Sequence, residues 1–369
     1  ISHLGRGKEE LEIARQNREV LRDFFGVLKS GRVNDVLKFV FLTGISKFSQ
    51  VSIFSELNNL DDLSMQESYA TILGYEENEI EEYFAEHLQR LAGKLKLSVP
   101  EVLEKIREWY DGYRFSDAGV RVYNPFSVLK VLKEGKFKNY WFETATPAFL
   151  VNLIKERDYP ILELEALRIA PSQFTTYDLD DLALEPLLFQ TGYLTIHDYD
   201  GLLYELSYPN REVKISFTEF LYNQLVPIGE RGTKAQYRLL ATHLVKGELE
   251  AFIATVNGIL SAIPYVHIQG QDEHYYHTVF YLMLTAGGIS VHTEVLTSRG
   301  RMDMAVETQD RVYVIELKCN QSAAEAIKQI KERGYGERYR GKGKQIILLG
   351  INFDTARREV GDWQVEKLD

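Results

Sequence analysis

The stretch Gly300-Arg-Met-Asp-Met-Ala-Val-Glu-Thr-Gln-Asp-Arg-Val-Tyr-Val-Ile-Glu-Leu-Lys318 decides the fold of the C-terminal part of the chain. Its two halves are rich in β-forming residues, and the polar pair Gln309-Asp310 lies between them. Two such runs on either side of a short polar turn predict the strands of a hairpin. We therefore expect strands from Arg301 to Thr308 and from Arg311 to Lys318.

The register of this hairpin places two carboxylates side by side. In a symmetric hairpin Thr308 pairs with Arg311, and counting five positions along each strand then sets Asp303 opposite Glu316. Directly opposed residues have Cβ atoms about 4.5–5.5 Å apart, which suits two carboxylates that share one cation. Side chains alternate along a strand, so Lys318 lies on the same face as Glu316.

A third carboxylate is expected on this face from a preceding strand, Val291 to Thr297. A turn at Ser298-Arg299 pairs Glu294 with Asp303 by the same count. Like charges so close together are costly without a counter-charge, and a hard divalent cation such as Mg²⁺ or Mn²⁺ removes the conflict. A lysine beside such a cation can orient or activate water, and this combination suits attack on a phosphodiester.

A surface ion pair between Glu316 and Lys318 is the alternative, because Glu-x-Lys alone is a weak motif. The surrounding run Val312-Tyr-Val-Ile-Glu-Leu is otherwise apolar on both faces, as in a buried strand, which favours a functional site. Flanking segments predict helices and one more strand. With helices over Glu273 to Leu284 and Ala323 to Arg333 and a strand over Gln345 to Gly350, the expected order is α-β-β-β-α-β.

Several of these residues resemble the motifs of the PD-(D/E)XK nuclease superfamily, namely Gly300-Arg-Met-Asp303, Ile315-Glu-Leu-Lys318, Gln329-Ile330 and Tyr335. The αβββαβ order is the core of that superfamily, so the resemblance implies a restriction-endonuclease-like domain over residues 266–369. It also implies a nuclease that depends on Mg²⁺ or Mn²⁺ and acts on DNA. The proline of the superfamily's name is absent, because Arg301-Met302 precedes Asp303.

The resemblance assigns a role to individual residues. Asp303 and Glu316 would be metal ligands, and Lys318 would be the catalytic lysine. Gln329 matches a helix residue that supports the site. The alternative is an ordinary polar residue at the edge of the buried face of this helix. Glu273 matches a carboxylate that several members place near the metal, although it could equally be an exposed acid at a helix start.

A basic segment overlaps and follows the second predicted helix. Residues 328–344 contain seven basic and two acidic side chains, and Tyr335 and Tyr339 lie between them. Basic patches with interleaved aromatic residues are typical of contacts with a phosphate backbone. A solvated charged face is the alternative. The candidate nucleic-acid contacts are Arg301, Lys331, Tyr335, Arg338, Arg340, Lys342 and Lys344.

The N-terminal part resembles a bacterial group in which an AAA-ATPase-like domain precedes a nuclease-like domain. The residues that carry this resemblance run from Phe39 to Leu60. We expect residues 1–63 to be the C-terminal remnant of such an α/β domain, with a helix from Glu9 to Leu28 and a buried strand from Leu37 to Gly44. No phosphate-binding G-x-x-x-x-G-K-[ST] loop occurs, so ATP hydrolysis is not expected. The missing N-terminal ATPase segment with its P-loop would be a partner of this chain.

The middle of the chain is expected to be mainly helical over residues 64–209. The alternating segments Tyr193 to His197 and Leu202 to Leu206 predict a hairpin, and a helix packed against it indicates a winged-helix-like element. Pro209-Asn-Arg211 is the clearest linker, and residues 210–265 predict a helical connector to the last domain. The fold class is therefore α/β and multidomain.

Composition narrows the function further. The chain has 43 basic and 54 acidic residues, a net charge of −11, which argues against a generally basic nucleic-acid coat but not against a local patch. Its one cysteine excludes an intrachain disulfide, and His277, His292 and Cys319 fit no zinc spacing, so we expect these three side chains to pack in the interior. No apolar run can span a bilayer and no signal-peptide pattern is present, so we expect a cytoplasmic protein without a membrane partner.

The leading hypothesis is a metal-dependent nuclease. The alternative is a non-cleaving nucleic-acid-binding or regulatory switch protein that keeps the nuclease fold.

Overall fold

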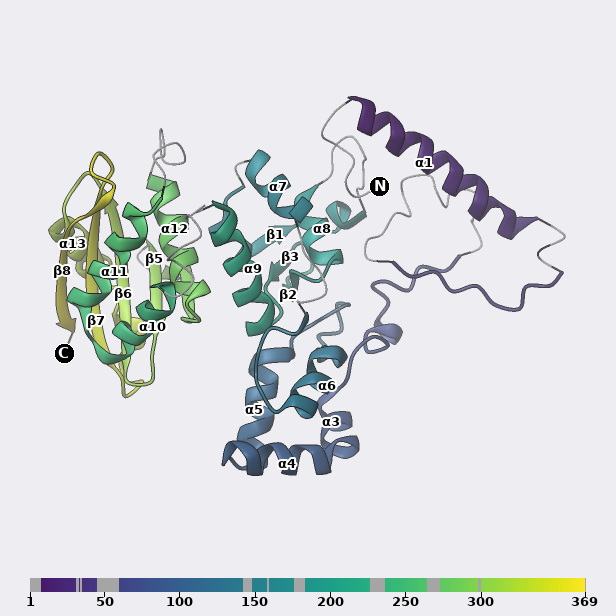
Figure 1. The fold of residues 1–369 in the computed structure, drawn as a ribbon, viewed down its shortest axis with the longest axis horizontal. Coiled ribbons are helices and arrows are strands. Elements are labelled where there is room, and N and C mark those ends of the chain that lie inside the picture. The colour runs from purple at the N-terminus through teal and green to yellow at the C-terminus, as the bar shows by residue number, and fades with distance from the viewer. Residues whose placement is uncertain are drawn as a thin grey trace. The chain divides into compact units, whose positions relative to one another are not determined.

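The computed structural model describes residues 8–30, 33, 35–44, 60–141, 148–157, 159–175, 183–225, 236–263, 273–297 and 300–368 (Figure 1). The chain divides into two compact units, residues 1–213 and residues 214–369. Each unit contains its own cluster of buried apolar side chains. No helix among the described residues is long and apolar enough to cross a membrane.

The N-terminal segment contains one long helix. Helix α1 (Lys8–Gly26) and the 3-10 turn η1 (Val27–Lys29) agree with the expected helix. Residues 37–44, by contrast, form no strand and are largely exposed, with Phe39 80% accessible. A buried strand needs partners for its backbone groups, and no described segment pairs with this one. The prediction of a buried strand is therefore wrong.

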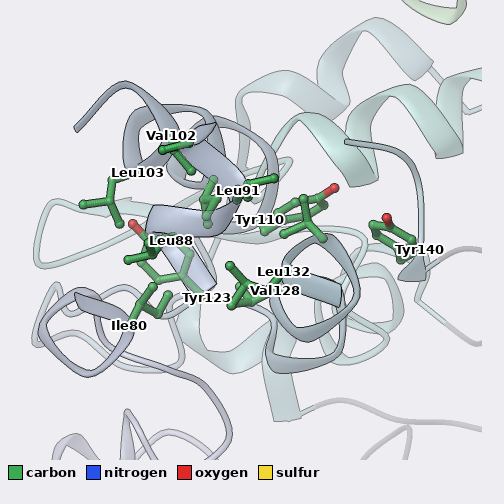
Figure 2. Close-up of a cluster of buried hydrophobic side chains, with 13 residues drawn as sticks. Ile80, Leu88, Leu91, Val102, Leu103, Tyr110, Tyr123, Val128, Leu132 and Tyr140 are labelled. Atoms are coloured by element: carbon green, nitrogen blue, oxygen red, sulfur yellow. The ribbon is translucent and has the colours of Figure 1, made fainter. Parts of the chain in front are cut away.

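Helices form the next part of the first unit and enclose a core of aliphatic and aromatic side chains (Figure 2). After the 3-10 turn η2 (Glu67–Tyr69) come α3 (Glu77–Tyr83), α4 (Ala85–Leu95), α5 (Val99–Tyr110) and α6 (Pro125–Glu134). Local sequence explains the helix starts. The Ser98 side chain accepts a hydrogen bond from the backbone of Glu101, whose carboxylate accepts one from Ser98 in return. At the start of α6, the Asn124 side chain accepts a hydrogen bond from the backbone of Ser127, and Pro125 follows as the first helical residue.

A three-stranded antiparallel sheet completes the first unit. Its strands are β1 (Leu167–Ile169), β2 (Thr195–Tyr199) and β3 (Tyr204–Ser207), in the order β1-β3-β2. The expected hairpin is confirmed as β2 and β3, whereas β1 is too short to show a period in the sequence. The same part of the chain contains α7 (Ala148–Glu156), α8 (Leu184–Gln190) and the 3-10 turns η4 (Ile161–Glu165) and η5 (Pro171–Thr175).

The second unit begins with helices and ends with a five-stranded sheet. The helices are α9 (Arg211–Leu225), which starts just before the division between the units, α10 (Gln236–Lys246), α11 (Leu249–Ser261) and α12 (Glu273–Ala286). The strands are β4 (Val291–Thr297), β5 (Gly300–Glu307), β6 (Arg311–Cys319), β7 (Gln345–Asp354) and β8 (Glu359–Leu368), which neighbour each other in that order. Helix α13 (Ala323–Arg333) and the turn η7 (Glu337–Tyr339) connect β6 to β7. Those two strands run parallel, and the other neighbours are antiparallel.

The expected α-β-β-β-α-β core is confirmed, and it forms a mixed sheet of the restriction-endonuclease-like kind. Strand β7 continues beyond the expected end at Gly350, and β8 is an addition to the predicted core. The helices expected as a connector are part of this unit, because α10 contacts α12 and α11 contacts β8.

Helices cover both faces of the five-stranded sheet (Figure 1). On one face, Ile330 of α13 belongs to the same buried cluster as Val314 of β6. On the other face, the ring of Phe280 from α12 lies 6.0 Å from the ring of Phe353 on β7. Because side chains alternate along a strand, Glu316 shares the face of Val314 and lies beneath α13.

Candidate active site

Glu316 is almost completely buried at the centre of the candidate site, with 1% of its surface exposed. Its Oε1 atom accepts a hydrogen bond from Lys318 Nζ at 3.2 Å and a second one from Gln329 Nε2 on α13. Its Oε2 atom is buried and has no hydrogen-bond partner among the described residues. Buried polar atoms are nearly always paired, so a free carboxylate oxygen in the interior indicates a position for a ligand.

Asp303 lies opposite Glu316, as the sequence register predicts. Strand β5 pairs with β6 through Met304 and Ile315, so the next two residues to face each other are Asp303 and Glu316. The described pairing between the strands ends at this point, and Asp303 Oδ2 accepts a hydrogen bond from the backbone N–H of Leu317 at 2.8 Å. The carboxylate of Asp303 is thereby held against the strand that carries Glu316.

Burial changes the protonation of both carboxyl groups. Burial, together with the negative charge of Asp303, raises the pKa of Glu316 to about 7, although Lys318 opposes the change. Burial likewise raises the pKa of Asp303, against the opposing charge of His277. Raised values mean that the two anions are costly without a cation. Oxygen donors in this state fit a hard divalent ion such as Mg²⁺ or Mn²⁺.

On helix α12, His277 is more deeply buried than Glu273, the residue expected near the metal. The side chain of His277 is 15% exposed and that of Glu273 is 51% exposed. His277 Nε2 is buried without a hydrogen-bond partner among the described residues. Its distance to Glu273 Oε1 is 3.6 Å, which is too long for a hydrogen bond. Burial lowers the pKa of His277, and the charge of Asp303 is the main influence against that change.

Two further expected residues lie where only the backbone is described. The register of β4 and β5, with Thr293 opposite Met304, places Glu294 opposite Asp303 as predicted. The side chains of Glu294 and Arg301 lie outside the described residues, so their roles stay predictions. Among the described side chains, no three His, Cys, Asp or Glu residues form a group that could hold a metal ion.

The basic segment of residues 328–344 is joined to acidic side chains. Lys344 Nζ lies 3.2 Å from Glu307 Oε2, and Lys342 Nζ lies 3.5 Å from Glu307 Oε1. Lys331 forms an ion pair with Glu366 of β8. These two acids come from outside the segment, so its local positive charge is smaller than the sequence alone indicates.

The aromatic residues of this segment are buried. Tyr335 is 2% exposed, and both Tyr335 and Tyr339 belong to the cluster between α13 and the sheet. The expected contact between Tyr335 and nucleic acid is therefore corrected, because the ring packs in the core. Arg338 lies over the ring of Tyr339 at 5.5 Å, and Arg340 pairs with Glu337 at 2.6 Å.

A polar residue that sequence analysis missed, Asn352, fixes the start of α13. It lies on β7 beside Lys318 and is buried. Its Oδ1 atom accepts a hydrogen bond from the backbone of Gln321 at 3.0 Å, and its Nδ2 atom donates to Asp362 Oδ1 at 2.7 Å. Asp362 Oδ2 in turn accepts the backbone N–H of Ala323, the first residue of α13, at 2.7 Å.

This network helps to place Gln329 over the sheet. Gln329 lies in the second turn of α13, and its contact with Glu316 depends on both the hydrogen bonds at the helix start and the packing of Ile330 against the sheet. A single amide side chain within an otherwise apolar strand could have identified Asn352 as a buried polar residue. The sequence analysis missed it because the strand was expected to end at Gly350.

Comparisons with known proteins match the two ends of the chain. The family described as PD-(D/E)XK nuclease superfamily matches residues 271–363, and the family described as predicted AAA-ATPase matches residues 5–54. A protein from Azotobacter chroococcum mcd 1, described as an uncharacterized protein in the vnfD 5′ region, is 37% identical over 370 residues. The alignment covers 97% of this chain and 68% of that relative.

Proposed function

The chain belongs to the family that joins an AAA-ATPase-like segment to a domain of the PD-(D/E)XK nuclease superfamily, and we propose that this domain cleaves phosphodiester bonds in DNA with the help of Mg²⁺ or Mn²⁺. The observation that carries the proposal is the buried Oε2 atom of Glu316, which has no partner among the described residues and belongs to a carboxylate opposite Asp303. Lys318 lies beside the same carboxylate and supplies the positive group that such a site needs.

Each side chain has a distinct role in this proposal. Asp303 and Glu316 would hold the cation, which would stabilise the negative charge that builds on the phosphate oxygens. Lys318 is 14% exposed and is placed to donate a hydrogen bond to a water molecule or a phosphate oxygen. Gln329 orients Glu316, because its hydrogen bond to Oε1 keeps Oε2 turned away from the other donors.

The proposed path of the DNA backbone follows the basic segment. The contacts are Lys331, Arg338, Arg340, Lys342 and Lys344, with Arg301 as a further candidate on β5. Four of these residues, Lys331, Arg340, Lys342 and Lys344, make ion pairs with carboxylates that are partly exposed to solvent. Surface pairs of this kind contribute about 0–1 kcal/mol each, so phosphate groups can displace the carboxylates at little cost.

A non-cleaving protein that binds nucleic acid or acts as a regulatory switch is the second candidate. It is favoured by the arrangement around Glu316, where Lys318 and Gln329 already satisfy Oε1. The lack of a three-ligand metal group among the described side chains points the same way. In this alternative, Lys318 is a counter-ion for Glu316 and has no role in a reaction.

A cleavage assay distinguishes the two candidates. The full chain is incubated with single-stranded, double-stranded and branched DNA and with RNA in Mg²⁺ or Mn²⁺, with EDTA as the control. A nuclease predicts cleavage that EDTA abolishes and that Asp303→Ala and Glu316→Ala each lose. Asp310→Ala removes an exposed acid from the turn of the same hairpin and should keep the wild-type rate.

The assay also has outcomes that contradict the nuclease proposal. Binding of nucleic acid without cleavage under all conditions would favour the second candidate. A wild-type rate for either Asp303→Ala or Glu316→Ala would show that the site has been assigned to the wrong residues.

A further inference from the structure

A hairpin of residues 354–359 joins β7 to β8 and is visible as the yellow loop at the upper end of the sheet (Figure 1). Strand β7 pairs with β6 through Asn352 and Lys318, so the turn that follows β7 lies just beyond the lysine. This turn contains two consecutive arginines, Arg357 and Arg358. Neither arginine belongs to the basic segment.

Hydrogen bonds connect the β7–β8 hairpin to the residues that follow Lys318. Asn320 Nδ2 donates to Thr355 Oγ1 at 2.9 Å, and Asn320 Oδ1 accepts the backbone N–H of Thr355 at 3.0 Å. The backbone N–H of Asn320 also donates to the carbonyl oxygen of Phe353 at 2.9 Å. The hairpin is therefore held beside the strand that carries the lysine.

Arg358 has a backbone conformation that arginine rarely adopts. Its φ of 61° lies in the left-handed region, where Lys96 and Asn320 are the other non-glycine residues of the described chain. Its N–H closes the turn by donating to the carbonyl oxygen of Asp354 at 2.7 Å. Glycine adopts this conformation without strain, so an arginine here is less favourable for the fold than glycine would be. A strained residue beside a candidate site favours a role other than stability.

The guanidinium group of Arg357 is available for a new partner. The side chain is 75% exposed and lies 3.8 Å from Asp354 and 4.0 Å from Glu359, distances too long for hydrogen bonds. Asp354 Oδ1 instead accepts the backbone N–H groups of Ala356 and Arg357, at 2.9 Å each. Exposed ion pairs of this kind are weak, so a phosphate group can replace the two carboxylates.

The hairpin and the last lysine of the basic segment lie at opposite ends of β7. This strand begins directly after Lys344 and ends at Asp354. Its ten residues make nine steps of about 3.3 Å, or about 30 Å, which is the length of about nine base pairs of duplex DNA. Glu316 lies opposite Gly350, between the two ends. A duplex that followed the strand would therefore meet basic side chains on both sides of the carboxylate pair.

We propose that the β7–β8 hairpin is a second contact site for the phosphate backbone of duplex DNA, in which Arg357 and Arg358 bind phosphates on the side of the carboxylate pair opposite to the basic segment. This inference rests on the proposed function, because it concerns the same DNA. Arginine forms two parallel hydrogen bonds with a phosphate group, which makes it well suited to this contact. Contacts with the backbone carry no sequence information, so they strengthen the binding of every sequence.

Anisotropy titrations of the full chain with duplex DNA at several salt concentrations test the contact, in EDTA so that no metal-dependent cleavage occurs. Each lost phosphate contact should flatten the slope of log affinity against log salt by about 0.9, which corresponds to about eightfold weaker binding at 0.1 M salt. We expect this change in Arg357→Ala and in Arg358→Gly, and twice the change in slope when both are combined. Lys133→Ala removes an exposed charge from α6 in the other unit and should leave affinity and slope unchanged.

Arg358→Gly also separates a contact with DNA from a role in the fold. Because glycine adopts a positive φ without strain, this variant should melt at the same temperature as the wild-type protein or at a higher one, while it binds DNA more weakly. A lower melting temperature would show that the arginine is needed for the fold, and it would overturn its assignment as a DNA contact.

The outcomes separate this inference from the proposed function. Unchanged affinity and salt slope in both hairpin variants, with a wild-type protein that cleaves DNA, would overturn the hairpin contact and leave the nuclease intact. Flattened slopes in the variants of a protein that cleaves no DNA would support the hairpin contact and overturn the nuclease. Failure of the wild-type protein to bind duplex DNA would overturn both.

Discussion

Replacing Glu316 with glutamine should stabilise the metal-free protein at neutral pH. The substitution keeps the size of the side chain and its Oε1 acceptor, which receives the hydrogen bonds of Lys318 and Gln329, and it removes the charge. Burial and the charge of Asp303 raise the pKa of Glu316 from 4.5 to about 7, so the folded state binds this proton more tightly than the unfolded chain does. Between these two pH values the unfolding free energy of the wild-type protein therefore falls as pH rises.

The size of the effect follows from the difference between the two pKa values of Glu316. One pKa unit corresponds to about 1.4 kcal/mol, so the change from 4.5 to about 7 corresponds to an upper value on the order of 3 kcal/mol. This penalty is absent below pH 4.5 and complete above about pH 7. The raised pKa of Asp303 contributes in the same direction, so some pH dependence remains in Glu316→Gln.

Urea unfolding in EDTA at about pH 5 and about pH 8 measures the difference. Trp363 on β8 reports on the sheet alone when Trp109 and Trp141, which lie in the first unit, are replaced by phenylalanine. In that background the wild-type Glu316 protein should lose more unfolding free energy between the two pH values than Glu316→Gln does.

Glu307→Gln on β5 is the matched control. Although burial opposes the change, hydrogen bonds and charge from Lys344 and Lys342 lower the pKa of Glu307, so its anion stabilises the fold. Neutralising it should cost up to about 1 kcal/mol at neutral pH, which is opposite in sign to the effect of Glu316→Gln. Parallel pH profiles for the wild-type protein and Glu316→Gln, or a less stable Glu316→Gln at about pH 8, would refute the reasoning.

Three further predictions test other parts of the site. Lys318→Ala should keep Mn²⁺ binding in calorimetry and lose at least about 100-fold in turnover, whereas equal losses of both would contradict a separate role for the lysine. Neutralising Arg338, Arg340 and Lys342 together should weaken DNA binding for all sequences. In anisotropy titrations it should also flatten the slope of log affinity against log salt by about 0.9 for each lost phosphate contact, and an unchanged slope would place the DNA elsewhere. Asn352→Ala removes the hydrogen bonds at the start of α13 and should cost about 1–3 kcal/mol by the Trp363 assay, whereas a neutral effect would contradict the network.

The central hairpin was predictable because its register is local. A tight turn determines which residues face each other, so the short stretch from Gly300 to Lys318 was enough to predict the observed register up to Met304 and Ile315, the neighbours of Asp303 and Glu316. Strand β8 was not predictable in the same way. Its apolar positions Val360 and Trp363 are three residues apart, which breaks a period of two, and a register shift in its pairing with β7 accompanies this irregular spacing.

The errors concern properties that depend on distant parts of the chain. The apolar run from Leu37 to Gly44 has the composition of a buried strand, but burial requires a neighbouring strand that no described residues supply. Tyr335 follows a basic helix and could have faced solvent, yet its ring packs in the core beneath that helix. For His277, the sequence predicts an interior position, but only the structure shows that one ring nitrogen has no hydrogen-bond partner among the described residues.

Stability and chemistry make opposite demands on Glu316. A carboxylate whose two oxygens were both hydrogen-bonded would be cheaper to bury, and its pKa would be lower. It would also have to give up a hydrogen bond before it could hold a cation. Lys318 and Gln329 both donate to Oε1, so they orient the group and partly offset its charge while Oε2 stays open. Burial and the charge of Asp303 raise the pKa of Glu316, and no described hydrogen bond at Oε2 offsets them. An open oxygen on a carboxylate with a raised pKa is what the proposed role in cation binding requires.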